Sequence, residues 1–199
     1  MLSKQEKLDL IQEKVSACTL CQQLVANRTN TVFGCGDFNS SVIFAGEAPG
    51  RAEDEQGEPF VGRSGKLLTN ILNACGLTRE EIYILNIVKC RPPNNRNPES
   101  EEILNCRPFL ELQLKTINPK YIVCLGAVAA RGILKTTEKV GYLRQQWHEI
   151  DKPINAKVLV TYHPSYLLRN PPAKKDVWED LQMLLKESGL QSLNKAVES

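Results

Sequence analysis

Polar, turn-forming sequence follows three short apolar runs of the chain, and these segments carry the side chains best suited to chemistry. The first is Gly46–Gly50, which includes the carboxylate of Glu47; the second begins at Asn86, and the third at His163. Together they supply a carboxylate, an amide, an imidazole and several arginines, a set that can bind a polar ligand and hold a proton. Each segment also has an ordinary interpretation. Gly-x-x-x-Gly after a strand is often only a tight turn, and a lone histidine is more often a hydrogen-bonded structural residue.

The seven cysteines are an odd number, so they cannot all pair as disulfides within one chain. Cys18 and Cys21 form a C-x2-C pair, and Cys90 and Cys106 have fifteen residues between them. Two such pairs predict a four-thiolate site, which suits either structural zinc or an iron–sulfur cluster. The spacing alone does not choose between these two. The remaining cysteines are expected to be spare thiols: Cys35, Cys75 and Cys124.

Apolar runs alternate with helical patterns, and this alternation defines the expected fold. Strands are predicted at 41–45, 82–88, 121–125 and 157–162, with helices before, between and after them. The pattern predicts an α/β fold with a four-stranded, mainly parallel sheet and helices on both faces. Because ligands of such sheets bind beyond the carboxyl ends of the strands, the polar segments should meet at one edge.

The chain of 199 residues is expected to form a single domain, residues 1–199. The longest irregular stretches are predicted at 46–65, 92–97 and 136–155, and loops of that length in a small domain are usually functional. Residues 190–199 are polar and are expected to be a frayed tail.

Composition narrows the class of protein. Apolar residues make up 42% and charged residues 24%, the balance of a folded globular protein, which excludes disordered and collagen-like chains. The net charge is only +2, so any nucleic-acid binding must depend on local basic patches. The charged N-terminus does not resemble a signal peptide, and the longest uncharged apolar stretch, 121–130, is too short to cross a bilayer. We therefore expect a cytoplasmic protein without a membrane partner.

Four segments taken together resemble the family 4 uracil-DNA glycosylases, the iron–sulfur branch of the uracil glycosylase superfamily. They are Cys18-x2-Cys21; GEAPG at 46–50 with Glu53-Asp54 and PFVGRSG at 59–65; NIVKCRPPNNR at 86–96 with Cys106; and YHPSYLLR at 162–169. The order and spacing of these segments over most of the chain make the resemblance specific. One departure is Gln145, which stands where the family pattern leads us to expect glycine.

The resemblance implies an α/β/α sandwich with a 4Fe-4S cluster on four cysteines: Cys18, Cys21, Cys90 and Cys106. Residues 1–40 would then form the cluster-binding N-terminal segment. The implied reaction is hydrolysis of the N-glycosidic bond of deoxyuridine in single- or double-stranded DNA, leaving free uracil and an abasic site. A uracil within a duplex must first be flipped out of the stack. The implied partner is uracil-containing DNA, and a monomer is expected.

The resemblance also implies which residues bind uracil. Phe60 would stack on the base, and Asn86 would read N3–H and O4, because its amide offers both an acceptor and a donor. Glu53 would lie near C5 and exclude the methyl group of thymine. The alternative for Glu53 is a carboxylate that only caps the following helix.

Charge develops at O2 of the leaving base, and stabilising it would be the task of His163 and of backbone N–H groups at Gly46, Glu47 and Ala48. A neutral imidazole suffices as such a donor. Glu47 and Asn95 are assigned jointly to the attacking water and to the positive sugar.

Contacts with DNA are expected from basic and polar residues around these segments. The candidates are Lys66, Arg91, Arg96, Ser165, Leu168, Arg169, Lys174 and Lys175. Leu167, Leu168 or Arg169 would wedge into the gap left by the flipped base, unless one of the two leucines belongs to the core. The alternative for Lys89, Arg91 and Arg96 is an ordinary solvated face.

Two other classes of function compete with the glycosylase. One is a non-enzymatic nucleic-acid-binding protein with a structural four-cysteine zinc site, and the other is a redox protein that uses an iron–sulfur cluster for electron transfer. Iron in the purified protein separates the zinc protein from the other two. Release of uracil from DNA separates the glycosylase from both.

Overall fold

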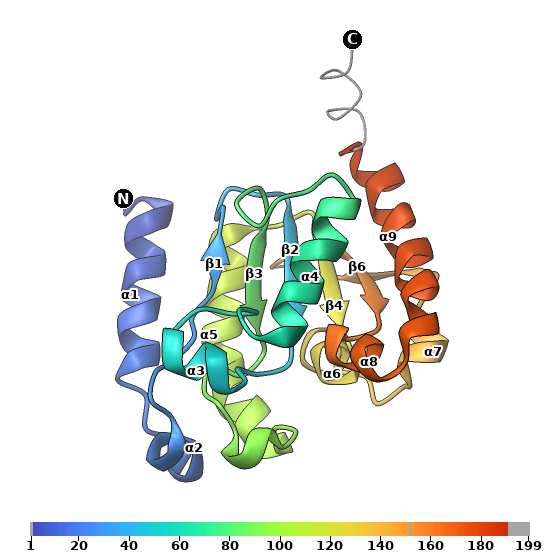
Figure 1. Cartoon of the computed structure of the whole chain (residues 1–199). Coiled ribbons are helices and arrows are strands. Elements are labelled where there is room, and N and C mark those ends of the chain that lie inside the picture. Colours follow the sequence, from blue (N-terminus) through green and yellow to red (C-terminus); the bar gives the residue numbers. More distant parts are fainter. Residues whose placement is uncertain (1, 152, 191–199) are drawn as a thin grey trace.

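The computed structural model describes residues 2–151 and 153–190, so nearly all of the tail predicted at 190–199 lies outside the described residues. At its centre is a six-stranded sheet in the order β1-β3-β2-β4-β6-β5 (Figure 1). The strands are β1 (Cys35–Gly36), β2 (Val42–Gly46), β3 (Tyr83–Asn86), β4 (Tyr121–Leu125), β5 (Trp147–Ile150) and β6 (Ala156–Thr161).

The four predicted strands are β2, β3, β4 and β6, and they pair in parallel as expected. The predicted number of four strands is nevertheless too low. The sheet has six, because β1 and β5 each add an antiparallel strand at one edge. An edge strand pairs on one side only and is partly exposed, so it needs no continuous apolar run. This explains why β5, whose residues are half-buried or exposed, was not recognised within 136–155.

Helices cover both faces of the sheet and give the predicted three-layer α/β/α sandwich (Figure 1). They are α1 (Lys4–Ser16), α2 (Gln22–Asn27), α3 (Arg51–Gln56), α4 (Arg63–Ala74), α5 (Ser100–Ile117), α6 (Ala127–Leu134), α7 (Val140–Leu143), α8 (Pro164–Arg169) and α9 (Lys174–Ser188), with 3-10 turns at Pro93–Asn95 and Pro171–Ala173. Across residues 2–151 and 153–190, none of these helices combines the length and the apolar character needed to span a membrane.

The central strands bury side chains on both faces, and this forms two cores. Ile43 of β2 packs with α1, α5 and α6 on one side, while its neighbour Phe44 packs with α4, α8 and α9 on the other. Both side chains are fully buried. Burial of one such side chain contributes about 1.5–3 kcal/mol. The two cores therefore hold the carboxyl ends of β2, β3 and β6 rigidly, and these ends carry the three polar segments.

The segment 46–65 is not irregular, because α3 interrupts it. This helix begins after Gly50 and ends at Gly57, whose φ of 74° is left-handed and suits glycine. Its six residues, RAEDEQ, carry no apolar period, so no sequence pattern marked it. Asp54 of α3 is buried and accepts hydrogen bonds from the backbone N–H groups of Thr29 (2.9 Å) and Asn30 (3.2 Å), which joins the N-terminal segment to this helix.

A buried ion pair fixes the end of β6 against α9. The carboxylate of Asp180 is fully buried and binds Nε of Arg144 at 3.0 Å and the hydroxyl of Thr161 at 2.6 Å. The Arg144 guanidinium also lies 5.1 Å from the ring centroid of Tyr162, directly before His163. Removing one partner of such a pair typically costs about 3–5 kcal/mol, because it leaves a buried charge unpaired.

Gln145 follows this arginine with a φ of 59°, in the left-handed region, which explains why glycine was expected at this position. A left-handed conformation costs a non-glycine residue about 1–2 kcal/mol. The Gln145 side chain donates an exposed hydrogen bond to Glu179 (3.2 Å), and its backbone N–H donates to the carboxylate of Asp180.

We expect Gln145→Gly to stabilise the protein by about 0.5 kcal/mol, because relief of the left-handed strain exceeds the added entropy of the unfolded chain. Urea unfolding measures this change. Gln146→Gly is the matched control, because Gln146 is exposed and does not have a positive φ, and it should destabilise. A lower stability of the Gln145→Gly variant would contradict the strain argument.

Candidate active site

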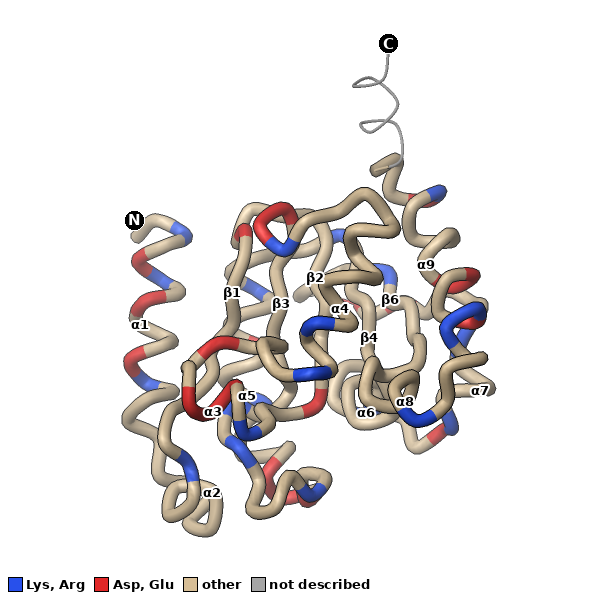
Figure 2. Tube along the Cα trace, in the orientation of Figure 1, with Lys and Arg blue, Asp and Glu red and all other residues tan. Residues whose placement is uncertain are grey.

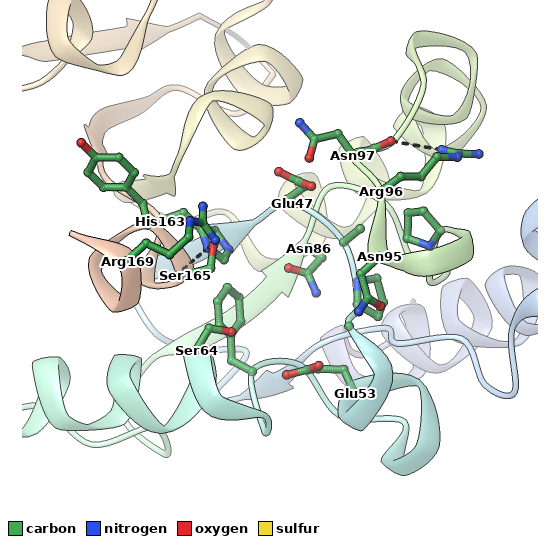
Figure 3. Close-up of a pocket in the computed structure, with 16 residues that line it drawn as sticks. Glu47, Glu53, Ser64, Asn86, Asn95, Arg96, Asn97, His163, Ser165 and Arg169 are labelled. Atoms are coloured by element: carbon green, nitrogen blue, oxygen red, sulfur yellow. Dashed lines mark hydrogen bonds between the residues drawn. The ribbon is translucent and has the colours of Figure 1, made fainter. Parts of the chain in front are cut away.

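The carboxyl ends of β2, β3 and β6 open onto a cavity of about 540 Å³, formed by segments far apart in the sequence (Figure 3). Gly46 and Asn86 are register partners at the adjoining ends of β2 and β3. His163 is the N-cap residue of α8, two residues after the end of β6, and lines the same cavity. The prediction that three polar segments meet at one edge of the sheet is therefore confirmed.

Most of the predicted site residues line this cavity. They are Glu47, Ala48, Glu53, Phe60, Asn86, Asn95, Arg96, His163, Ser165 and Arg169. The cavity is also lined by residues that the sequence analysis did not select: Pro49, Gly50, Ser64, Pro92, Asn97 and Tyr166. All six lie within or beside the motifs, so proximity to a motif was the signal that could have found them. Six predicted residues lie outside the cavity lining: Gly46, Lys66, Arg91, Leu168, Lys174 and Lys175.

Gly46 lies directly behind two of the lining side chains, Asn86 and Phe60. A Cβ atom at this position would lie 2.4 Å from Oδ1 of Asn86 and 2.5 Å from Cζ of Phe60. The Phe60 ring is 5% exposed, and its centroid lies 5.7 Å from that of His163. An aromatic face, an amide and an imidazole thus surround one space, an arrangement suited to a flat heterocycle.

Asn86 has an unusual hydrogen-bonding state. The residue is 2% exposed, and its buried Oδ1 atom has no hydrogen-bond partner among the described residues. An unpaired buried acceptor costs about 1–3 kcal/mol. In Figure 3 the amide points into the cavity. The site is therefore poised for a ligand that donates a hydrogen bond to this oxygen.

The imidazole of His163 is held as a neutral donor. Its Nδ1 accepts a hydrogen bond from the backbone N–H of Ser165 (3.1 Å) and lies 2.8 Å from the Ser165 hydroxyl. Burial, with a smaller contribution from the positive charge of Arg169, lowers the pKa of His163 to about 4. A neutral ring that accepts at Nδ1 carries its proton on Nε2. His163 can therefore donate a hydrogen bond at neutral pH.

Glu47 and Asn95 approach the cavity from different loops and differ in their partners. Burial raises the pKa of Glu47, and the positive charge of Arg131 partly opposes this. Asn95 is exposed, has a left-handed φ of 53°, and accepts a hydrogen bond from Nε of Arg91 at 2.7 Å. The Asn95 oxygen is therefore already engaged, whereas the Glu47 carboxylate faces the cavity.

Glu53 lines the cavity and also accepts two backbone hydrogen bonds at the start of α4. Its Oε1 accepts hydrogen bonds from the backbone N–H groups of Val61 (3.0 Å) and Gly62 (2.9 Å), directly before α4. The residue also lines the cavity and is 7% exposed. Its carboxylate is consequently fixed in position and cannot swing away from the cavity wall.

Helices α4 and α8 contact each other, and both carry basic residues (Figure 2). Lys66 and Arg169 are exposed. Leu168 is 42% exposed, whereas Leu167 is fully buried. Leu167 thus belongs to the core, whereas Leu168 lies at the surface.

The two arginines of the 91–96 loop are already engaged with neighbouring groups. Arg91 binds Asn95, as described above, and Arg96 forms a bidentate pair with Glu102 at 2.7 and 2.9 Å. Glu102 is 6% exposed, and its hydrogen bond with Arg96 lowers the pKa of this carboxyl. The pair holds the loop beside the cavity and partly neutralises the charge of Arg96.

The four predicted ligand cysteines converge at one place, although they come from distant parts of the chain. Cys18, Cys21, Cys90 and Cys106 line a small cavity between α2, the loop after β3 and α5. Three of the sulfurs accept an N–H group: Cys90 from Arg28 (3.0 Å), Cys106 from the backbone of Lys89 (3.3 Å) and Cys21 from Asn105 (3.6 Å). Such donors suit sulfurs that carry negative charge.

Lys89 is fully buried beside this cavity, so its interpretation as part of a solvated face is wrong. Its Nζ donates hydrogen bonds to the carbonyl oxygens of Asn86 (2.9 Å) and Phe33 (3.1 Å). Burial lowers the pKa of Lys89 to about 8, and the sulfurs of Cys106 and Cys90 oppose this shift. A cation therefore lies between the four thiols and the strand end that carries Asn86.

The chemistry of the donor set fits a metal–sulfur group. Four thiols from separate segments line one small cavity. Four cysteine ligands suit either structural zinc or an iron–sulfur cluster.

The fold and the site together define the class of protein. The sequence profile of the Uracil DNA glycosylase superfamily matches residues 33–182, which include the sheet and the whole cavity lining. The chain is 45% identical to the type-4 uracil-DNA glycosylase of Thermotoga maritima over 92% of this chain and 95% of that protein. It is also similar to the type-4 enzymes of Archaeoglobus fulgidus (40% identical; 90% and 92% covered) and Saccharolobus solfataricus (43%; 89% and 84%). The chain belongs to the type-4 uracil-DNA glycosylase family.

The raised pKa of Glu47 predicts how stability depends on pH. A carboxyl that binds its proton more tightly in the folded state loses folding free energy as the pH rises from the unfolded pKa through the folded one. We expect the unfolding free energy of the wild-type protein to fall relative to Glu47→Gln as the pH rises above 4.5. Urea unfolding over a pH series measures this difference.

Arg131 provides the control for this prediction, because it is exposed and its charge opposes the shift. In an Arg131→Gln background the loss should begin at the same pH, extend to higher pH and become larger. A difference between wild type and Glu47→Gln that does not change with pH would show that the carboxyl titrates normally.

Proposed function

We propose that this chain is a DNA repair glycosylase that hydrolyses the N-glycosidic bond of deoxyuridine and leaves free uracil and an abasic site. Membership of the type-4 family supports this activity. The observation that carries the proposal is the buried, unpartnered Oδ1 of Asn86, which faces a cavity bounded by the Phe60 ring and His163. The N3–H group of uracil would supply the missing hydrogen bond.

Recognition of uracil follows from the chemistry of these side chains. The Asn86 amide would accept from N3–H and donate to O4, a pattern that cytosine does not offer. Phe60 would stack on the flipped base. The carboxylate of Glu53, fixed by two backbone N–H groups, would close the C5 side and leave no space for the methyl group of thymine.

Cleavage would transfer the electron pair of the C1′–N1 bond to the base, which gives a uracil anion and an oxocarbenium-like sugar. The Nε2–H of His163 and backbone N–H groups of Gly46, Glu47 and Ala48 would stabilise the charge at O2. One preorganised donor of this kind typically contributes about 3–4 kcal/mol to the rate. The lowered pKa of His163 supports a neutral donor rather than an imidazolium.

Water would then add to C1′, with Glu47 positioned to orient it and to face the positive sugar. The proton that the water loses would pass to the uracil anion, so the products would be free uracil and an abasic sugar with a hydroxyl at C1′. The side-chain oxygen Oδ1 of Asn95 already accepts a hydrogen bond from Arg91, so Asn95 would act through its side-chain NH2 group. This division supports Glu47 as the group nearer to the water and Asn95 as a positioning residue for the DNA or the sugar.

DNA binding would depend on the exposed charges around the cavity. Lys66 and Arg169, with Lys174 and Lys175 further along the chain, are exposed and suited to phosphates. Leu168 would wedge into the stack, while Ser165 would act mainly by holding His163. Arg91 and Arg96, which have protein partners, would contribute less to the electrostatic attraction.

A 4Fe-4S cluster on Cys18, Cys21, Cys90 and Cys106 is the cofactor we propose. The common cavity and the three N–H donors to sulfur support it. The cluster would tie the N-terminal segment to the loop after β3, and the hydrolysis needs no electron transfer. Family membership favours this assignment over the non-enzymatic zinc protein and the redox protein. A monomer that acts in the cytoplasm remains our expectation.

Asn86→Asp tests the proposed activity on oligonucleotides that contain one deoxyuridine. The wild-type protein should release uracil, and the variant should be slower by about 100-fold or more, because a carboxylate cannot donate to O4 and would be a buried charge without a partner. Single-turnover release of labelled uracil measures both.

Asn73→Asp is the control, since it makes the same change at an exposed position of α4. It should keep the wild-type rate. Release of no uracil by the wild type would refute the activity, and an unchanged rate for Asn86→Asp would refute the role of Asn86.

Cys90→Ala tests the ligand set by metal analysis. The wild-type protein should contain iron and show the brown absorbance of a cluster, and the variant should lose both, because three thiolates cannot close the site. Cys75→Ala is the control, since Cys75 is a buried thiol at the end of α4, away from the shared cavity. Zinc in place of iron in the wild type, or full iron in Cys90→Ala, would contradict this proposal.

A further inference from the structure

Phe60 owes its position in the cavity to an unusual backbone conformation. Its φ of 54° lies in the left-handed region, which a non-glycine residue keeps only when its surroundings impose it. The carbonyl group of Phe60 is packed against the first turn of α4, where a Cβ atom at Gly65 would lie 1.9 Å from the Phe60 oxygen. A rotation of this backbone would carry the ring away from Gly46 and His163.

Arg79, in the segment between α4 and β3, holds this conformation from outside the cavity. Its Nη1 donates a hydrogen bond to the carbonyl oxygen of Phe60 (2.9 Å), and its Nη2 donates to that of Pro59 (2.7 Å). The guanidinium is planar, so two bonds to consecutive carbonyls fix the orientation of both peptide units. Arg79 does not line the cavity.

The other neighbours of Arg79 are weaker. Glu58 pairs with it at 3.4 Å through a half-exposed carboxylate, and the sulfur of Cys35 lies at 3.6 Å. The Arg79 side chain is only 16% exposed. It is therefore poorly placed to bind a DNA phosphate, and its strongest contacts are the two carbonyl groups.

We propose that Arg79 is a positioning residue for base recognition, which keeps the Phe60 ring oriented to stack on the flipped base. This inference rests on the proposed function, because it assumes that Phe60 contacts uracil. It assigns a role to a residue outside all four motif segments. Arg79 acts only through Phe60, and this distinguishes it from a residue that merely stabilises the fold.

A double-mutant cycle tests this dependence. Arg79→Ala should lower the single-turnover rate constant for uracil release about 10- to 100-fold in the wild-type background. In a Phe60→Ala background the same substitution should lower it less than twofold. Guanidinium ion should restore activity to Arg79→Ala but not to the double variant. Glu58→Gln is the control, because it removes the ion pair and leaves both carbonyl contacts, so it should keep the wild-type rate.

Equal losses in the two backgrounds would overturn the proposal, since they would show that Arg79 acts on the fold as a whole. The wild-type rate in the same assay tests the proposed function separately. Fluorine NMR gives a readout without activity, with 4-fluorophenylalanine incorporated at position 60. The signal should shift or split in Arg79→Ala and stay unchanged in Glu58→Gln, and an identical signal in Arg79→Ala would also overturn the proposal.

Discussion

The absence of a side chain at Gly46 is the constraint on which the candidate active site depends. The parallel pairing of β2 with β3 makes Gly46 the neighbour of Asn86, and a Cβ there would collide with both the Asn86 amide and the Phe60 ring. Because glycine leaves this space open, an aromatic face and an amide from separate segments can share one cavity. The two apolar cores fix the strands, so the meeting point is determined by the sheet and not by the loops alone.

The sequence predicted the strands and the shared edge because both follow from simple patterns. Buried parallel strands such as β4 are continuous apolar runs, and their carboxyl ends necessarily lie together. The same patterns could not reveal the edge strand β5 or the polar helix α3, which carry no apolar period. They also could not reveal that Lys89 is buried. A lysine close to arginines in the sequence is expected at the surface, and the two carbonyl groups that accept from its Nζ are found only in the folded structure.

Residues in the motif segments were found, but the contacts that hold them were not. Glu53 was assigned to the base, and its bonds to the Val61 and Gly62 N–H groups became visible only in three dimensions. Arg79 lies between predicted elements, in a segment without a motif. In both cases a second group restricts the side chain that lines the cavity. Backbone N–H groups hold the Glu53 carboxylate, and the Arg79 guanidinium holds the backbone of Phe60. Sequence spacing records which residues are present, whereas this fixing depends on distances across the fold.

Lys89 connects the four thiols to the strand end that carries Asn86. Its backbone N–H binds the sulfur of Cys106, while its ammonium group binds the carbonyl of Asn86 at the end of β3. The same ammonium group reaches Phe33, whose carbonyl also accepts from Gln113 of α5 (3.1 Å). A buried cation is costly unless negative charge and acceptors surround it. With the proposed cluster bound, anionic sulfurs on one side and carbonyl oxygens on the other would meet this need. Binding of the cluster and the correct placement of Asn86 would then stabilise each other.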